Sequence, residues 1–131
     1  MKHNNQKQYA GVWLDNEKAM IITTGIESEN SDYTITNKVK AKSPQGGGSE
    51  HSMNNAKHSD MLKYFKSISG LLLNYDELLV FGPGQSQEQF QNFLKEDLQF
   101  NNTQVTIESN ERLTDPQMIA KVRDFFKLRQ A

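Results

Sequence analysis

The sequence contains no cysteine, only three prolines and no long apolar run. The absence of cysteine excludes disulfides, thiolate metal sites and a cysteine nucleophile. The longest apolar stretches, such as 71–73 (LLL), are too short to span a bilayer. The polar N-terminus MKHNNQKQ does not have the apolar core of a cleaved signal peptide. We therefore expect a cytoplasmic protein with no membrane partner.

An excess of charge of one sign is lacking as well, since 15 Lys and Arg stand against 16 Asp and Glu. A net charge of −1 excludes a basic field over the whole surface, so only a local patch can attract nucleic acid. The length of 131 residues suits one domain with one core. We expect a flexible tail at 1–8, a single domain at 9–128, and no cofactor.

Alternating and continuous apolar patterns predict five β-strands. In the third of them, Tyr33, Ile35 and Val39 alternate with polar residues, which predicts one half-buried face. Asp15 and Asn16 are typical of a hairpin turn between the first two strands. The predicted strands lie at 9–14, 18–24, 33–39, 77–81 and 104–108.

Helical spacing predicts three helices in the second half of the chain. Ser59 or Asp60 is expected to cap the first, and capping boxes at 86–89 and 114–117 are expected to start the other two. The inward positions of the first two helices are Met61, Leu62, Phe65, Ile68 and Leu72, then Phe90, Phe93, Leu94 and Leu98. Those of the third are Met118, Ile119, Val122, Phe125 and Phe126.

The order of these elements is β-β-β-α-β-α-β-α. Strands that alternate with helices imply parallel pairing in the second half, and the opening hairpin implies antiparallel pairing in the first. The sequence therefore predicts an α/β fold with the ribonuclease H-like motif, in which helices pack on a mixed five-stranded sheet.

The segment 41–57 interrupts this pattern, because it contains three glycines, a proline and almost no apolar side chain. Such a segment buries too little surface to offset its ordering entropy, and we expect a mobile loop. Between Lys38 and His58, Glu50 is the one acid among several lysines. Two interpretations stay open: lysines that contact a phosphate backbone, or a solvated strand edge that lysine protects from aggregation. The lysines are Lys38, Lys40, Lys42 and Lys57.

Three other features carry weaker signals. Asp15 stands where a ribonuclease H-type metal ligand would be, but no second acid ends the strand at 77–81, and the turn interpretation is favoured. His3, His51 and His58 are scattered and no carboxylate-rich spacing accompanies them, so no metal site is predicted. Gly82, Gly84 and Ser86 form a strand–turn–helix segment that suits an anion, although a simple tight turn is the favoured interpretation.

Several of these segments together resemble a known family. GVWLDNEKAMII, the Gly-rich loop, LLVFGPGQSQEQFQNFL and LTDPQMIAKVRDFF resemble bacterial relatives of the archaeal and eukaryotic peptide-chain release factors. The likeness is to the middle domain of release factor one and of Pelota, and it spans roughly 10–126. The resemblance implies the ribonuclease H-like motif, in agreement with the order of elements.

The release-factor loop carries Gly-Gly-Gln, which assists hydrolysis of peptidyl-tRNA. Here the loop reads Gln45, Gly46, Gly47, Gly48, so a glycine stands where those factors have Gln. Pelota-type factors also lack this Gln and act in ribosome rescue without hydrolysis. The resemblance thus implies a non-catalytic protein bound to the ribosome or to tRNA, through the lysines named above and this loop.

Two alternatives remain open at this stage. One is a peptidyl-tRNA hydrolase with a degenerate loop. The other is a protein-interaction module, with a protein partner or a second copy, in which the loop is only a tether.

Overall fold

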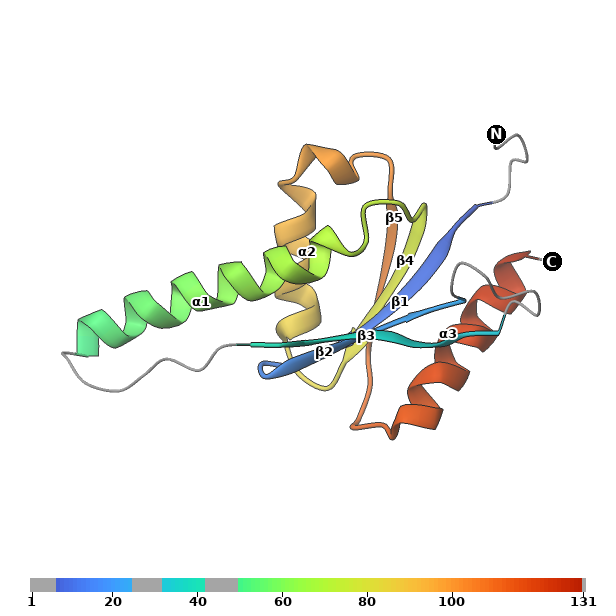
Figure 1. Cartoon of the computed structure of the whole chain (residues 1–131), viewed down its shortest axis with the longest axis horizontal. Helices are drawn as coiled ribbons and strands as arrows, with labels where there is room; N and C mark the ends of the chain where they lie inside the picture. Colours follow the sequence, from blue (N-terminus) through green and yellow to red (C-terminus); the bar gives the residue numbers. More distant parts are fainter. Residues whose placement is uncertain (1–6, 25–31, 42–49, 131) are drawn as a thin grey trace.

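The computed structural model describes residues 7–24, 32–41 and 50–130, with side chains except at 50–58 and 129–130. Five strands form one sheet in the order β3-β2-β1-β4-β5 (Figure 1). β1 pairs antiparallel with β2 and β2 with β3, whereas β1 and β4, and β4 and β5, run parallel. The strands are β1 (Tyr9–Leu14), β2 (Lys18–Thr23), β3 (Thr34–Lys40), β4 (Glu77–Gly82) and β5 (Gln104–Ser109).

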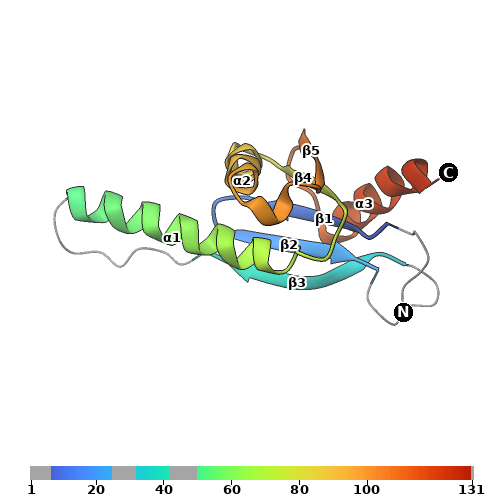
Figure 2. The same ribbon diagram turned by 90° about the horizontal axis from the view of Figure 1, so that it is seen from above.

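Three helices cover the two faces of this sheet. α1 and α2 lie on one face and α3 on the other, as the two orthogonal views show (Figures 1 and 2). The helices are α1 (Glu50–Gly70), α2 (Ser86–Lys95) and α3 (Asp115–Gln130), with a short 3-10 turn, η1 (Leu98–Phe100), after α2. The predicted α/β fold with a mixed five-stranded sheet is thus confirmed, and each strand bound lies within one residue of its prediction.

The core lies on both sides of the central strands. Every residue of β4 is buried, because helices pack on both of its faces. Along β1, Val12 and Leu14 face α1 and α2, while Trp13 faces α3. These two layers explain why the central strands have continuous apolar sequences rather than alternating ones. None of the helices in the described ranges is long and apolar enough to cross a bilayer.

The prediction of a single apolar face on β3 is wrong. The register shifts between Ile21 and Ile22 of β2, which pair with Asn37 and Ile35. Thr36 is therefore the extra residue of a β-bulge. Because a one-residue shift exchanges the two faces of a strand, Ile35 packs with the α3 layer and Val39 with the opposite layer.

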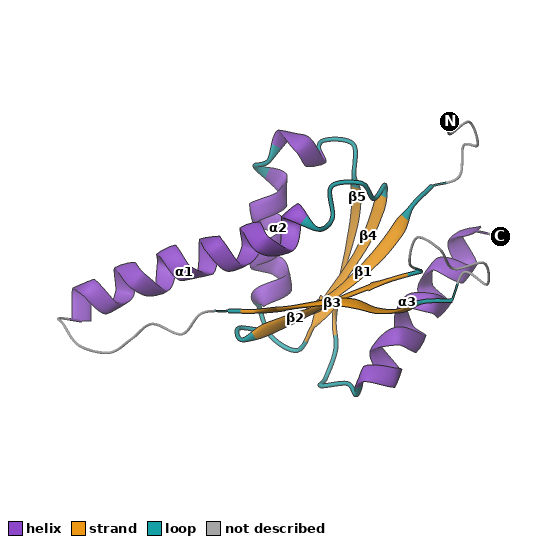
Figure 3. Cartoon of the chain, in the orientation of Figure 1, coloured by secondary structure: helices purple, strands orange, loops and turns teal. Residues whose placement is uncertain are grey.

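The predicted start of the first helix is also wrong, since α1 begins at Glu50 and not at Ser59 or Asp60. The N-terminal half of α1 extends beyond the sheet (Figures 1 and 3). Among the described side chains of α1, Met61 is the earliest that packs against the core. A helix segment that extends beyond the sheet needs no apolar stripe, so the sequence pattern could not reveal it. We call residues 50–60 the arm.

Helix starts and inward positions were predicted with mixed success. The capping box of α3 is confirmed, because the Gln117 amide donates to Thr114 Oγ1 at 3.3 Å and the Thr114 amide donates to Gln117 Oε1 at 2.8 Å. The box predicted for α2 is wrong: Gln85 is its N-cap and no side chain caps it. Leu62 and Leu98 are 43% and 79% exposed, so these two inward assignments are wrong.

Candidate nucleic-acid interface

The predicted RNA-binding residues fall in different parts of the structure. Lys38 and Lys40 lie on β3 with exposed side chains. Lys57, expected in the loop, lies instead in the arm of α1, because the backbone is helical from Glu50 onward. The remaining five positions lie outside the described residues: Lys42, Gln45 and the glycines 46–48.

The strand register adds a third lysine that the sequence pattern did not indicate. Lys18 of β2 pairs with Lys40, and Met20 pairs with Lys38. Because side chains two residues apart share a face, Lys18, Lys38 and Lys40 lie on the same face as Met20, which is the α3 face. Directly paired residues have Cβ atoms about 5 Å apart, and residues two apart on one strand are separated by about 7 Å. We call these three residues the lysine cluster.

The bulge at Thr36 creates the lysine cluster. Without it, the pairing of Ile22 with Ile35 would continue along the strands and place Val39, not Lys40, opposite Lys18. The lysines of β3 would then project from the other face. Thr36 is held in place by its hydroxyl, which lies 3.1 Å from Thr23 Oγ1 and donates to the Ile21 carbonyl at 3.4 Å. A pairing of like charges across neighbouring strands is destabilising, so the fold holds a local charge that packing alone would not favour.

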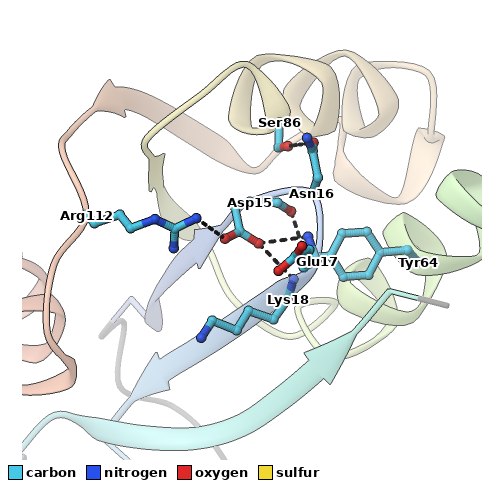
Figure 4. A network of polar contacts seen from close by, with 7 residues as sticks. All are labelled: Asp15, Asn16, Glu17, Lys18, Tyr64, Ser86 and Arg112. Atoms are coloured by element: carbon cyan, nitrogen blue, oxygen red, sulfur yellow. Dashed lines mark hydrogen bonds and ion pairs between the residues drawn. The ribbon is translucent and has the colours of Figure 1, made fainter. Parts of the chain in front are cut away.

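Asp15 organises the hairpin turn next to the lysine cluster (Figure 4). Its Oδ1 accepts hydrogen bonds from the amides of Glu17 and Lys18 at 2.8 and 2.9 Å. Its Oδ2 lies 3.3 Å from the guanidinium of Arg112. The turn interpretation of Asp15 is confirmed, and its charge is balanced by Arg112 rather than by the lysines. In the described part of the chain, no group of three His, Asp or Glu residues is placed to hold a metal ion.

Two helices fix the same turn from the opposite side. The Tyr64 hydroxyl of α1 donates to the Asp15 carbonyl at 3.0 Å, in a buried position. Burial, and secondarily the negative charge of Asp15, raises the pKa of Tyr64 above its ordinary value, so this donor stays protonated at neutral pH. The Ser86 hydroxyl of α2 donates to Asn16 Oδ1 at 2.6 Å. The lysine cluster therefore stands on a hairpin that is anchored at its turn.

The glycine-rich turn after β4 has clear structural roles. A Cβ atom on Gly82 would lie 2.2 Å from the Leu14 carbonyl oxygen, so only glycine allows β4 to end this close to β1. The Gly82 carbonyl accepts from the Asn110 amide at 2.9 Å and from Gln87 Nε2 at 3.2 Å. A Cβ on Gly84 would meet open space. These contacts explain Gly82 and Ser86 without a ligand, and anion binding at Gly82, Gly84 and Ser86 stays a prediction.

The sequence has a second basic run near the C-terminus, and its charge is partly neutralised. It comprises Lys121, Arg123, Lys127 and Arg129. Lys121 of α3 forms an ion pair with Glu108 of β5. Arg123 lies 3.4 Å from the carboxylate of the neighbouring Asp124. The lysine cluster differs from this run, because Lys18 pairs with Lys40 and Lys38 pairs with Met20, so that none of the three has an acid opposite it across the strand pair.

Comparison of the structure with solved proteins identifies similar folds. Pelota from Archaeoglobus fulgidus aligns with a TM-score of 0.57 and 11% identity, over 96% of this chain and 37% of that one. Pelota from Thermoplasma acidophilum aligns with a TM-score of 0.57 and 19% identity, over 93% of this chain and 34% of that one. The archaeal translation termination factor aRF1 aligns less well, with a TM-score of 0.47 and 12% identity, over 93% of this chain and 40% of that one.

These alignments show that the fold of this chain is one that also occurs in Pelota. The chain spans little more than a third of the length of the two Pelota proteins. No protein-family model and no curated protein matches the sequence. The likeness at this level of identity concerns the fold, so a function has to be argued from the residues themselves.

Proposed function

We propose that this protein is a non-catalytic, translation-related factor that associates with the ribosome or with tRNA. The single observation that carries the proposal is the lysine cluster, three like charges that the β3 bulge gathers on one face of the sheet. The fold shared with Pelota directs the choice of nucleic acid toward RNA of the translation machinery. Contacts to phosphates need no base-specific geometry, which suits lysine.

In this proposal the sheet is a rigid platform and the charges are its contact points. Lys18, Lys38 and Lys40 meet RNA phosphates and release counterions. The Gly-rich stretch 46–48 is the proposed second contact, since glycines leave the backbone free to approach RNA closely. Glu50, which follows this segment in sequence, begins the arm that extends from the sheet (Figure 1).

The absence of catalysis is part of the proposal. Gly48 stands where the resembling release factors have Gln, and Asp15 is engaged by its turn and by Arg112. We expect no release of peptide when purified protein is incubated with ribosomes that carry peptidyl-tRNA. Peptide release above the rate without protein would favour the hydrolase alternative instead.

Sedimentation in sucrose gradients tests the association. The native protein is expected in ribosomal fractions from growing or starved cells, and K18Q/K38Q/K40Q is expected to shift toward the top of the gradient. The matched control K63Q/K66Q/K95Q removes the same charge from exposed positions on α1 and α2 and should sediment like the native protein. Absence of the native protein from every ribosomal fraction would overturn the proposal.

Removal of the Gly-rich segment separates a contact loop from a tether. Because α1 begins at Glu50, the replacement must stop at residue 49 to keep the helix intact. Replacement of 43–49 by a Ser-rich linker of equal length should weaken ribosome association if the segment contacts RNA. Unchanged association would assign the binding to the lysine cluster alone.

A further inference from the structure

The placement of the aromatic residues restricts the kind of RNA that this protein can bind. The chain has one Trp, four Tyr and seven Phe, and all of them lie in the described residues. Every one of these rings is buried or half-buried. Trp13, which shares the sheet face of the lysine cluster, is 1% exposed.

The half-buried aromatic rings near this face already pack against other aromatic rings of the protein. Tyr9 stacks on Phe126 with centroids 4.7 Å apart, and Tyr33 stacks on the same ring at 6.1 Å. Phe125 meets Phe126 edge-on at 4.9 Å. On the other face, Phe93 packs against Phe65 and Phe90, and the half-buried Tyr75 packs against the core. No aromatic side chain is thus presented as a platform for an unpaired base.

Single-stranded RNA is recognised chiefly by stacking of its splayed bases on aromatic side chains. Double-stranded RNA is recognised instead by its shape and by contacts to phosphates and 2′-hydroxyls, which need no exposed ring. The lysine cluster supplies the positive charge that such contacts to phosphates need. Arg112 already pairs with Asp15, so the buried carboxylate beside Lys18 does not offset the cluster.

The fixed backbone positions of the three lysines also favour a regularly spaced ligand. Lys18 lies on β2, a strand that pairs with β1 on one side and β3 on the other. Lys38 and Lys40 lie on the outer strand β3. The hairpin turn beside them is fixed by Tyr64 and Ser86. Lysines anchored at fixed strand positions suit phosphates at regular spacing, and phosphates are regularly spaced in a duplex but not in a flexible single strand.

Resting on the proposed RNA association, we propose that the lysine cluster binds the phosphate backbone of double-helical RNA, not the bases of single-stranded RNA. The protein then recognises paired regions of a structured RNA with little dependence on their sequence. The three lysines together contact phosphates of one RNA helix.

Fluorescence anisotropy with the full chain tests this inference. The probes are a 20-base-pair RNA duplex and an unpaired pyrimidine RNA of equal strand length. The duplex is expected to bind about tenfold more tightly, and K18Q/K38Q/K40Q should weaken duplex binding about tenfold or more. The slope of log K against log salt should fall by about one for each lysine removed. K63Q/K66Q/K95Q should match the native protein in both measurements.

The outcomes separate this inference from the proposed function. Tighter binding of the single strand, or an equal loss in both triple variants, overturns the inference. If the native protein sediments with ribosomes but binds no duplex, the inference alone fails. If duplex binding depends on the cluster but the protein is absent from ribosomal fractions, the proposed function alone fails. Circular dichroism of the triple variants confirms that each still folds.

Discussion

The central strand β4 and the outer strand β3 differ in almost every physical respect. Every residue of β4 is buried, whereas the residues of β3 are exposed or half-buried. β4 pairs with a strand on each side and lies between two helical layers, so each of its positions is fixed by packing. β3 is the outermost strand of the described sheet and has a bulge and two lysines. The centre of the sheet stabilises the fold, and the outer hairpin is free to carry a charge pattern that packing does not require.

The largest expected effect is at the end of β4. Gly82→Ala places a Cβ atom 2.2 Å from the Leu14 carbonyl oxygen, a backbone atom that cannot move aside without shifting β1. We expect the free energy of unfolding to fall by about 3 kcal/mol. Urea denaturation followed by circular dichroism measures the change.

Gly84→Ala is the matched control, because the same turn offers open space at that position. Its effect should stay within about 0.5 kcal/mol. Equal effects of the two substitutions would show that the turn is flexible, and that the close approach of β4 to β1 does not restrict position 82 to glycine.

The next effect concerns the bond that connects the core helix α1 to the hairpin turn. Tyr64→Phe removes the buried donor to the Asp15 carbonyl while it keeps the ring. We expect a loss of about 2 kcal/mol in the free energy of unfolding, because a buried acceptor loses its partner. Tyr75→Phe is the control. Tyr75 is a half-buried tyrosine in the connection between α1 and β4.

Alkaline pH sharpens this test. Burial, and secondarily its neighbour Tyr9, raises the pKa of Tyr33 from 10.0 to about 12, and burial raises the pKa of Tyr64 as well. The unfolded chain ionises these groups near pH 10 while the folded chain keeps them neutral, so stability is full below that pH and falls as pH rises through the folded pKa. The difference in melting temperature between the native protein and Tyr64→Phe should therefore shrink between pH 8 and about 11. A constant difference over that range would contradict the assignment.

A smaller effect is expected at the start of α3. Thr114→Ala removes the hydroxyl that accepts from the Gln117 amide and should lower the free energy of unfolding by about 1 kcal/mol. Thr114→Ser keeps the hydroxyl and should stay close to the native protein in thermal unfolding. A full loss in the serine variant would mean that the methyl group, not the cap, is responsible.

The sequence predicted the fold well because the core is built from strong local patterns. The run 77–81 is apolar throughout, and this is the pattern of a strand covered on both faces. The box at Thr114 and Gln117 was visible because its residues lie three apart in sequence. Features of this kind need no knowledge of distant contacts.

The features that the sequence did not predict depend on contacts between residues far apart in the chain, or lie in a segment that extends beyond the sheet. The first half of α1 is polar and extends beyond the sheet, so its sequence has no apolar stripe (Figure 1). Ser86 looked like a cap, but its hydroxyl is taken by Asn16, which is far away in sequence. The role of Lys18 in the candidate site depends on the bulge at Thr36, since a shift of one residue decides which side chain stands opposite. An exact strand register would have been the signal needed to find it.

The smallest effect tests the outer hairpin itself, through the pairing of Lys18 with Lys40. Lys40→Glu turns a repulsive cross-strand pair into an attractive one and should raise the free energy of unfolding by about 0.5 kcal/mol. The gain should decrease at high salt, because both side chains reach solvent. Lys38→Glu, opposite the uncharged Met20, should change stability less.

Measuring both the stability and the RNA binding of Lys40→Glu tests whether this residue is kept for binding. Lys40→Glu should weaken binding of the RNA duplex while it stabilises the fold, as expected where a charge is kept for function at the expense of packing. A variant that binds RNA normally and is more stable would show that Lys40 only protects the outer edge of β3. A variant without any salt-dependent change in stability would show that the Lys18 and Lys40 side chains diverge, and that the three lysines do not act as one cluster.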